Sequence, residues 1–228
     1  MHFFDFYSVI FFYFCAMVYN KETAIAISEY LLQIKAVKLN VKEPFTWASG
    51  IKSPIYCDNR KTLSFPKVRT FIRQQFVDII TELYGNVDLI AGVATGAIAL
   101  GVLVAQELGL PFVYVRSSEK KHGLENKIEG VYQSGQSVVV IEDLVSTGKS
   151  SLNAVDALRA GGCKVKGMLA IFNYNLDIAN ENFKNAKCQL NTLADYNELV
   201  NQAIEKNYIS DKDLKSLKKW REDPQKWG

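Results

Sequence analysis

The sequence predicts one α/β domain: a central parallel sheet flanked by helices, with a small N-terminal hood that contains a hairpin. Three observations lead to this fold class. Strand-like and helix-like segments alternate through the middle of the chain, which favours parallel strands joined by helical crossovers. The strand-like segments, such as residues 138–141, are continuous apolar runs, as expected where helices cover both faces of a sheet. A length of 228 residues suits one such domain with a small appendage.

The first predicted elements are two helices with a hairpin between them. Apolar residues recur at helical spacing over residues 22–37, which predicts a helix. A glycine and a proline interrupt β-prone residues over 45–60, which indicates a hairpin or meander. Pro66 is a suitable first residue for a second helix, and Gly85 is a suitable stop.

From residue 87 onward, strands and helices alternate. The paired glycines at 161 and 162 mark the end of one of these helices. The predicted strands are 87–91, 112–115, 138–141, 165–172 and a short one near 190–193, and the predicted helices are 97–108, 151–160, 195–206 and 211–221. We therefore expect hood elements over about 21–62, a core over about 66–194 and C-terminal helices over about 195–222, all within one domain of residues 17–228.

Residues 1–16 differ from the rest of the chain. From Phe6 to Tyr19 nearly every residue is aromatic or aliphatic, yet this run of about 14 residues is short of the ~20 that cross a bilayer. Asp5 precedes it and no Lys or Arg does, so the charged start of a signal peptide is missing. We expect an upstream extension, with translation beginning at Met17. A membrane-associated anchor and a buried segment remain the alternatives.

Charge and cysteine usage limit the classes of partner. The formal net charge is +3 and the basic residues are spread out, so neither a nucleic acid nor a membrane is expected as a partner. The four cysteines form no C-x-x-C pair and no cluster with histidine, so a zinc site is not expected. Their wide spacing favours free thiols and a cytoplasmic protein.

The most informative segment is Glu142-Asp-Leu-Val-Ser-Thr-Gly-Lys-Ser150, between a predicted strand and a predicted helix. Its Ser/Thr/Gly portion can offer backbone N–H groups and hydroxyls to a phosphate, and the helix N-terminus behind it favours negative charge. The two carboxylates in front suit sugar hydroxyls or a hydrated Mg²⁺. The segment therefore predicts a site for a phosphorylated sugar.

This segment allows two other interpretations. Gly148-Lys149-Ser150 matches the end of an ATP-binding P-loop, but that motif needs a glycine at position 143, where the chain has Asp143. A carboxylate there would repel the phosphates. The second alternative is an ordinary strand–turn–helix connection whose serine and threonine residues cap a helix.

Three candidate loops follow predicted strands, over residues 92–96, 116–123 and 142–150. In an open parallel sheet, ligands bind beyond the carboxyl ends of the strands. We therefore expect the three loops to meet at one edge of the sheet, an arrangement that a merely structural role would not require.

The whole pattern resembles a known family. Residues 142–150, after four β-branched residues, resemble the phosphoribosyl-pyrophosphate (PRPP) signature of the type I phosphoribosyltransferases. Residues 45–60 resemble the N-terminal hairpin of the orotate phosphoribosyltransferases, 92–96 their pyrophosphate loop, and 115–123 their mobile catalytic loop. The resemblance runs from about residue 21 to the end, and several motifs in one order are more specific than any single one.

This resemblance implies the type I phosphoribosyltransferase fold and transfer of a phosphoribosyl group from PRPP to orotate. The products would be orotidine 5′-monophosphate and pyrophosphate, a step of de novo pyrimidine synthesis. It also implies Mg²⁺, held mainly by PRPP, and a homodimer whose catalytic loop crosses to the neighbouring subunit. The alternatives are a purine-base phosphoribosyltransferase and a PRPP-binding regulator without catalysis.

The resemblance also assigns roles to individual residues. Lys120, His122 and Asp143 are the expected catalytic residues, while Ser146 and Tyr56 are expected to bind orotate. No residue is expected to ligate the metal directly. The expected PRPP-binding residues are Arg116, Lys120, His122, Glu142, Asp143, Leu144, Val145, Ser146, Thr147, Gly148, Lys149 and Ser150. Lys149 stands where relatives have a small residue, and it either points outward or adds a phosphate contact.

Overall fold

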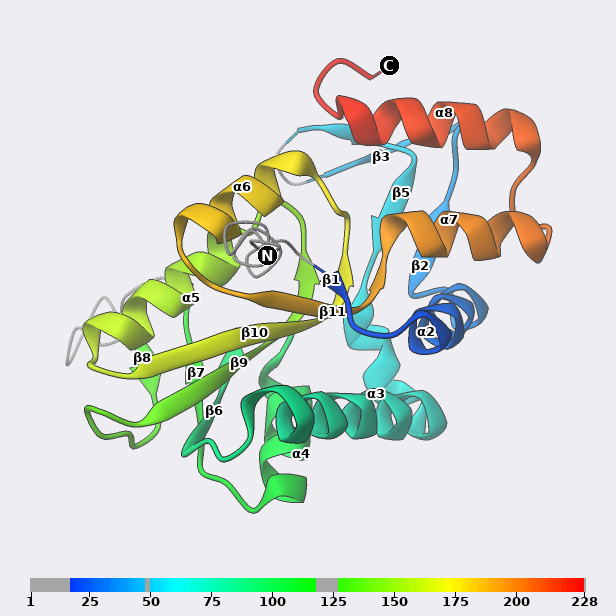
Figure 1. Cartoon of the computed structure of the whole chain (residues 1–228). Helices are drawn as coiled ribbons and strands as arrows, with labels where there is room; N and C mark the ends of the chain where they lie inside the picture. Colours follow the sequence, from blue (N-terminus) through cyan, green and yellow to red (C-terminus); the bar gives the residue numbers. More distant parts are fainter. Residues whose placement is uncertain (1–16, 48–49, 118–126, 228) are drawn as a thin grey trace, which may run out of the picture.

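A seven-stranded sheet forms the centre of the computed structural model, which describes residues 17–47, 50–117 and 127–227 (Figure 1). Its strand order is β1-β11-β10-β9-β6-β7-β8, and all neighbouring strands are parallel except β7 and β8. The seven strands are β1 (Met17–Val18), β6 (Leu89–Val93), β7 (Phe112–Val115), β8 (Ile128–Glu129), β9 (Ser137–Val145), β10 (Lys164–Asn173) and β11 (Leu190–Asp195).

Helices cover both faces of this sheet, as the continuous apolar strands predict. The described helices are α2 (Lys21–Gln33), α3 (Pro66–Ile79), α4 (Ile98–Leu108), α5 (Lys149–Ala160), α6 (Asp177–Asn185), α7 (Tyr196–Glu205) and α8 (Asp211–Glu222). The apolar residues of α5 and α6 pack on one face, and those of α2, α3, α4, α7 and α8 belong to the core on the other face. Figure 1 shows these two layers on opposite sides of the strands.

The hood consists of two small antiparallel sheets. Strand β2 (Val37–Leu39) pairs with β5 (Ile55–Cys57), and β3 (Phe45–Thr46) pairs with β4 (Lys52–Ser53). A 3₁₀ segment over Asn59–Ser64 then leads into α3. The hairpin predicted over 45–60 is thus confirmed in β3 and β4. Strand β5 pairs instead with β2, which was not predicted because it has only three residues.

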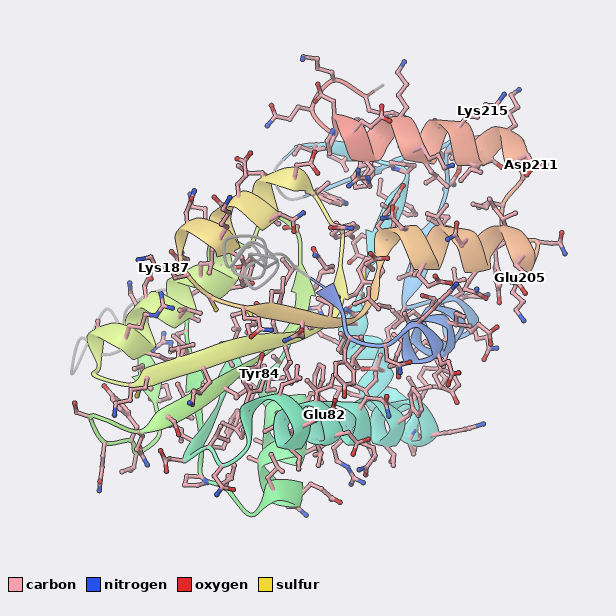
Figure 2. All side chains as sticks on the ribbon, in the orientation of Figure 1. Glu82, Tyr84, Lys187, Glu205, Asp211 and Lys215 are labelled. Carbon is pink, nitrogen blue, oxygen red and sulfur yellow. The ribbon has the colours of Figure 1, made fainter. Side chains whose placement is uncertain are left out.

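A π-helical turn over Ile80–Tyr84 continues α3. The turn ends at Gly85, which is the stop that the sequence predicts. This turn places Tyr84 beside the sheet (Figure 2), where its hydroxyl oxygen accepts a 2.9 Å hydrogen bond from the amide of Asn191 on β11. A Cβ at Gly167 on β10 would lie 2.9 Å from the Tyr84 ring, so glycine is needed for this close approach.

Several elements differ from the prediction. Helix α6 and strands β1 and β8 were not predicted, because α6 is largely polar and the two strands have only two residues each. Strand β9 was predicted to end at residue 141, but it continues through the acidic pair to Val145. Its backbone stays paired with β10 as far as Val145 and Asn173, so hydrogen bonding extends the strand where the apolar pattern stops.

The apolar stretch assigned to an N-terminal extension lies almost entirely outside the described residues, which begin at Met17. In the part of the chain that the structure describes, no helix combines the length and apolar character that crossing a membrane requires.

The C-terminal helix α8 joins the hood to the core through Trp220. This side chain is fully buried, and its ring centroid lies 5.5 Å from that of Trp47 in the hood and 5.5 Å from that of Tyr196 on α7. Its indole N–H donates a 3.1 Å hydrogen bond to the carbonyl oxygen of Lys52. One side chain therefore contacts the hairpin and the C-terminal helices together.

We expect Trp220→Ala to lower the free energy of unfolding by about 3–5 kcal/mol, because a large buried aromatic side chain is replaced by a cavity. Urea unfolding followed by circular dichroism measures this loss. Trp220→Phe keeps most of the packing and removes only the indole donor, so its loss should be clearly smaller. Equal losses for the two variants would contradict the packing role.

Candidate active site

A cavity of about 390 Å³ opens between β6 and β9. Helix α4, which follows β6, packs on one face of the sheet, and α5, which follows β9, packs on the other. The two chain segments therefore diverge here, which is the usual place for a ligand in an open parallel sheet. The cavity is lined by Cys57, Asp58, Arg60, Val93, Ala94, Thr95, Gly96, Glu142, Asp143, Leu144 and Ser150.

Glu142 lies on the α5 side of β9 and is 4% exposed. One carboxylate oxygen accepts a 2.7 Å hydrogen bond from the Ser151 hydroxyl, and the other accepts a 3.0 Å bond from the backbone N–H of Asp143. Burial raises the pKa of Glu142 well above its usual value, and the nearby charge of Asp143 raises it further. The two hydrogen bonds fix the side chain at the inner wall of the cavity.

Asp143 points to the opposite face of the strand, as expected for adjacent residues. Its carboxylate lies against the backbone of Gly96, where a Cβ would collide with it. Its backbone carbonyl accepts a 2.5 Å hydrogen bond from the Asn59 amide. Burial raises the pKa of Asp143, while the guanidinium of Arg60 acts in the other direction. Asp143 is thus held between the loop after β6 and the hood.

The segment from Cys57 to Arg60 closes the hood side of the cavity. Asn59 is 1% exposed, and its amide oxygen accepts a 3.2 Å hydrogen bond from the Cys57 thiol. The Nε of Arg60 donates a 2.7 Å hydrogen bond to the Asp58 carboxylate, which lowers the pKa of Asp58. Because Nε is held in this way, the two terminal amino groups of the guanidinium remain to meet an anion in the cavity.

The loop from Ser146 to Gly148 connects the acidic pair to α5. Gly148 has a positive φ of 77° and precedes the first residue of the helix, where the structure gives it no side-chain cap. The first N–H groups of an α-helix lack intrahelical partners, so an uncapped N-terminus can bind an anion. Ser150, in the first turn, lines the same cavity as the acidic pair. A phosphate and a sugar could therefore be bound side by side here.

Lys149 lines a different hollow, of about 550 Å³, between α5 and α6. Thr147 and Asn182 line the same hollow. Lys149 is exposed and does not line the cavity of the acidic pair, and its phosphate contact stays a prediction.

The remaining predicted residues lie in varied positions. Glu142, Asp143, Leu144 and Ser150 line the cavity, whereas the Val145 side chain is fully buried in the core. Ser146 is partly exposed at the end of β9. The catalytic candidates Lys120 and His122 lie outside the described residues.

Two predicted substrate contacts lie outside the lining of the described cavity. Tyr56 is 41% exposed, and its ring centroid lies 5.7 Å from that of Phe45 in the hairpin. Arg116 pairs with Glu129 across β7 and β8, at 3.4 Å between Nη1 and Oε1. Tyr56 belongs to β5 of the hood, and Arg116 directly follows β7.

Sequence reasoning did not single out Asn59 or Ser151. Asn59 is separated from its partner Asp143 by 84 residues. In the sequence, Ser151 is one of several polar residues at a predicted helix start. In the structure, its hydroxyl donates a hydrogen bond to the buried Glu142 carboxylate. The polar run Asp58-Asn59-Arg60 at the end of the predicted hairpin was the available signal for the first of them.

Among the described residues, no group of three or more His, Cys, Asp or Glu side chains is arranged to hold a metal ion. The Asp143 carboxylate lines the cavity and burial raises its pKa, so a nearby cation would stabilise its charged form. Such a site fits a cation that takes most of its ligands from a bound phosphate and from water, as Mg²⁺ does.

The burial of Glu142 predicts a pH-dependent stability. Because its pKa in the folded protein is raised, the folded state binds more protons than the unfolded chain between the usual pKa and the raised one. The free energy of unfolding therefore falls as the pH rises through that window. Below the usual pKa, both states are protonated and the difference disappears.

We expect Glu142→Gln to raise the free energy of unfolding near neutral pH, because the amide removes the buried charge and can still bond to Ser151 and the Asp143 N–H. The gain should shrink toward zero at about pH 4, and urea unfolding at the two pH values measures it. A gain of equal size at both values would contradict the raised pKa. Asp156→Asn, on the α5 helix but outside this cavity, is the control.

Comparisons with known proteins agree with this geometry. The family model for the phosphoribosyl transferase domain matches residues 64–200. An orotate phosphoribosyltransferase of Phocaeicola vulgatus is 56% identical over 88% of this chain and 94% of its own length.

Solved structures share the fold. The orotate phosphoribosyltransferase of Aeropyrum pernix superimposes with a TM-score of 0.70 at 24% identity, over 81% of this chain and 99% of its own. The UMP synthase of Leishmania donovani gives a TM-score of 0.71 at 24% identity over 88% of this chain, which spans 43% of that longer chain. With 56% identity over nearly the whole of a curated relative, the chain belongs to the orotate phosphoribosyltransferases of the type I phosphoribosyltransferase family.

Proposed function

We propose that this protein transfers the 5-phosphoribosyl group of PRPP to orotate, giving orotidine 5′-monophosphate and pyrophosphate in de novo pyrimidine synthesis. The observation that carries the proposal is that the acidic pair and Ser150, which lies in the first turn of a helix without a side-chain cap, line one cavity between β6 and β9. A sugar phosphate needs both features, and the named relatives act on orotate.

The 5-phosphate of PRPP binds at residues 146–150. Backbone N–H groups at the start of α5 donate to it, and the helix dipole favours its charge. Ser150 can add its hydroxyl, because it lines the same cavity as the acidic pair. These contacts lie far from the reacting C1 carbon, so they fix the position of the sugar and do not take part in the chemistry.

The ribose lies between the phosphate loop and Gly96. Asp143 accepts hydrogen bonds from the ribose hydroxyls. The negative charge of Asp143 stabilises the positive charge that develops on the ring as the C1–oxygen bond breaks. Glu142 lines the inner wall of the cavity. Because Asn59 and Gly96 hold Asp143 in place before substrate arrives, little reorganisation is needed during the reaction.

Pyrophosphate leaves along the loop after β6. Ala94–Gly96 lines the cavity, and the small residues let the backbone approach the leaving group. Arg116, Lys120 and His122 supply the positive charge and the hydrogen bonds that the departing oxygens need. When bound, mainly through PRPP, Mg²⁺ would act as a Lewis acid on the leaving group. Arg60 is a further cation at the cavity wall.

Orotate enters from the hood side. Tyr56 offers an aromatic face to its flat ring, and Ser146 offers a hydroxyl. The partial exposure of both residues leaves them accessible to a ligand. We further propose a cytoplasmic homodimer in which the loop containing Lys120 and His122 closes over the partner's site; support for this comes from the family resemblance. Loop closure would exclude water from the reactive centre.

The base preference tests the proposal directly. We expect PRPP-dependent consumption of orotate in the presence of Mg²⁺, followed by its ultraviolet absorbance, and no turnover of adenine or hypoxanthine. Removing Mg²⁺ with a chelator should abolish the activity. Turnover of a purine base in place of orotate would replace this proposal by a purine phosphoribosyltransferase, and PRPP binding without any turnover would indicate a regulator.

We expect Asp143→Asn to lower kcat by at least about 100-fold while the KM for PRPP changes much less, because the lost charge matters most in the transition state. Steady-state kinetics at saturating orotate measure both constants. Asp58→Asn provides the matched control, since it changes a carboxylate of the same cavity that faces Arg60. An equal loss of kcat in the control would mean that kcat depends on the overall charge of the cavity and not on Asp143 in particular.

A further inference from the structure

We infer that Asn182, on the unpredicted helix α6, is a positioning residue that sets the 5-phosphate loop in its anion-binding conformation. The inference rests on the proposed function of that loop. It assigns a role in PRPP binding to a helix that does not line the sugar cavity and that carries none of the family motifs.

Two neighbouring side chains of α6 contact the loop of residues 146–148. The amide of Asn182 donates a 2.9 Å hydrogen bond to the carbonyl oxygen of Thr147. Phe183, which is fully buried, packs against Gly148 so closely that a Cβ there would lie 2.7 Å from its ring. One contact fixes the direction of a peptide group, and the other sets how near the loop lies to the helix.

The direction of that peptide group decides where its N–H points. In a planar trans peptide, the carbonyl and the N–H of the next residue point in opposite directions. Because Asn182 holds the Thr147 carbonyl toward α6, the N–H of Gly148 points away from α6. It is then free to join the N–H groups at the start of α5 in binding a phosphate.

Helix α6 is itself firmly attached to α5. The Arg159 guanidinium donates hydrogen bonds of 2.7 Å to the carbonyl of Ala186 and 3.0 Å to that of Lys187, at the far end of α6. Lys187 is labelled in Figure 2 at this end of the helix. Ala179 and Phe183 also lie in the core cluster that includes the apolar side of α5. The helix can therefore act as a fixed support for the loop.

The loop has few other restraints. Helix α5 begins without a side-chain cap, and Gly148 has a left-handed conformation that glycine adopts without cost but does not enforce. Without Asn182, the Thr147–Gly148 peptide could rotate, and the N–H groups would have to be ordered when the phosphate binds. That ordering would weaken binding of the 5-phosphate and leave the chemical step unchanged.

The test uses two variants of the full chain, Asn182→Ala and Asn182→Leu, the second of which keeps the approximate size of the side chain but lacks the donor. Asn185→Ala is the control, because Asn185 lies on the same helix and lines the same hollow. Calorimetry with ribose 5-phosphate and with pyrophosphate separates the two ends of PRPP. Steady-state kinetics with PRPP gives kcat and KM.

Both Asn182 variants should raise the Kd for ribose 5-phosphate and the KM for PRPP by about 5- to 10-fold, as for one lost hydrogen bond. The Kd for pyrophosphate and kcat should stay within about twofold, and Asn185→Ala should resemble the wild type. The inference fails if ribose 5-phosphate binds both variants normally, or if pyrophosphate binding is lost equally, since that indicates general damage. If the wild type itself binds neither ribose 5-phosphate nor PRPP, the proposed function fails instead.

Discussion

The constraint on which the rest of the site depends is the burial of two adjacent carboxylates in the central sheet. Glu142 and Asp143 are adjacent residues of β9 that line one cavity, and each is held by different partners. Ser151 and a backbone N–H serve Glu142, while Asn59 holds the Asp143 carbonyl and Gly96 leaves room for its carboxylate. An unsatisfied buried carboxylate is costly, so these surroundings must form together with the strand.

These partners come from parts of the chain far apart in sequence, so the site joins several elements of the fold. Asn59 belongs to the hood, Gly96 follows β6, and Ser151 starts α5. The hood is in turn held to the C-terminal helices by Trp220. The loop beyond the acidic pair rests on α6 through Asn182 and Phe183. The residues that hold the acidic pair and the loop after it are therefore placed by different parts of the fold.

The sequence predicted the parallel sheet, its main strands and the Ser/Thr/Gly loop that joins β9 to α5, because apolar runs and a Ser/Thr/Gly turn are local signals. It did not predict where β9 ends, since the strand continues through Glu142 and Asp143 on the strength of pairing with β10. Helix α6 was missed because its few apolar residues, such as Phe183, are spread among polar ones. Contacts such as Asn59 with Asp143 could not be predicted either, because they depend on the folded arrangement of segments 84 residues apart.

In the proposed site, the acidic pair holds the ribose of PRPP and the uncapped start of α5 holds its 5-phosphate. A crystal structure of the protein with PRPP tests it most directly. The account predicts the 5-phosphate against the backbone N–H groups of residues 147–150 and the ribose hydroxyls within hydrogen-bond distance of the Asp143 carboxylate. A 5-phosphate bound elsewhere, or a ribose that makes no contact with Asp143, would contradict it.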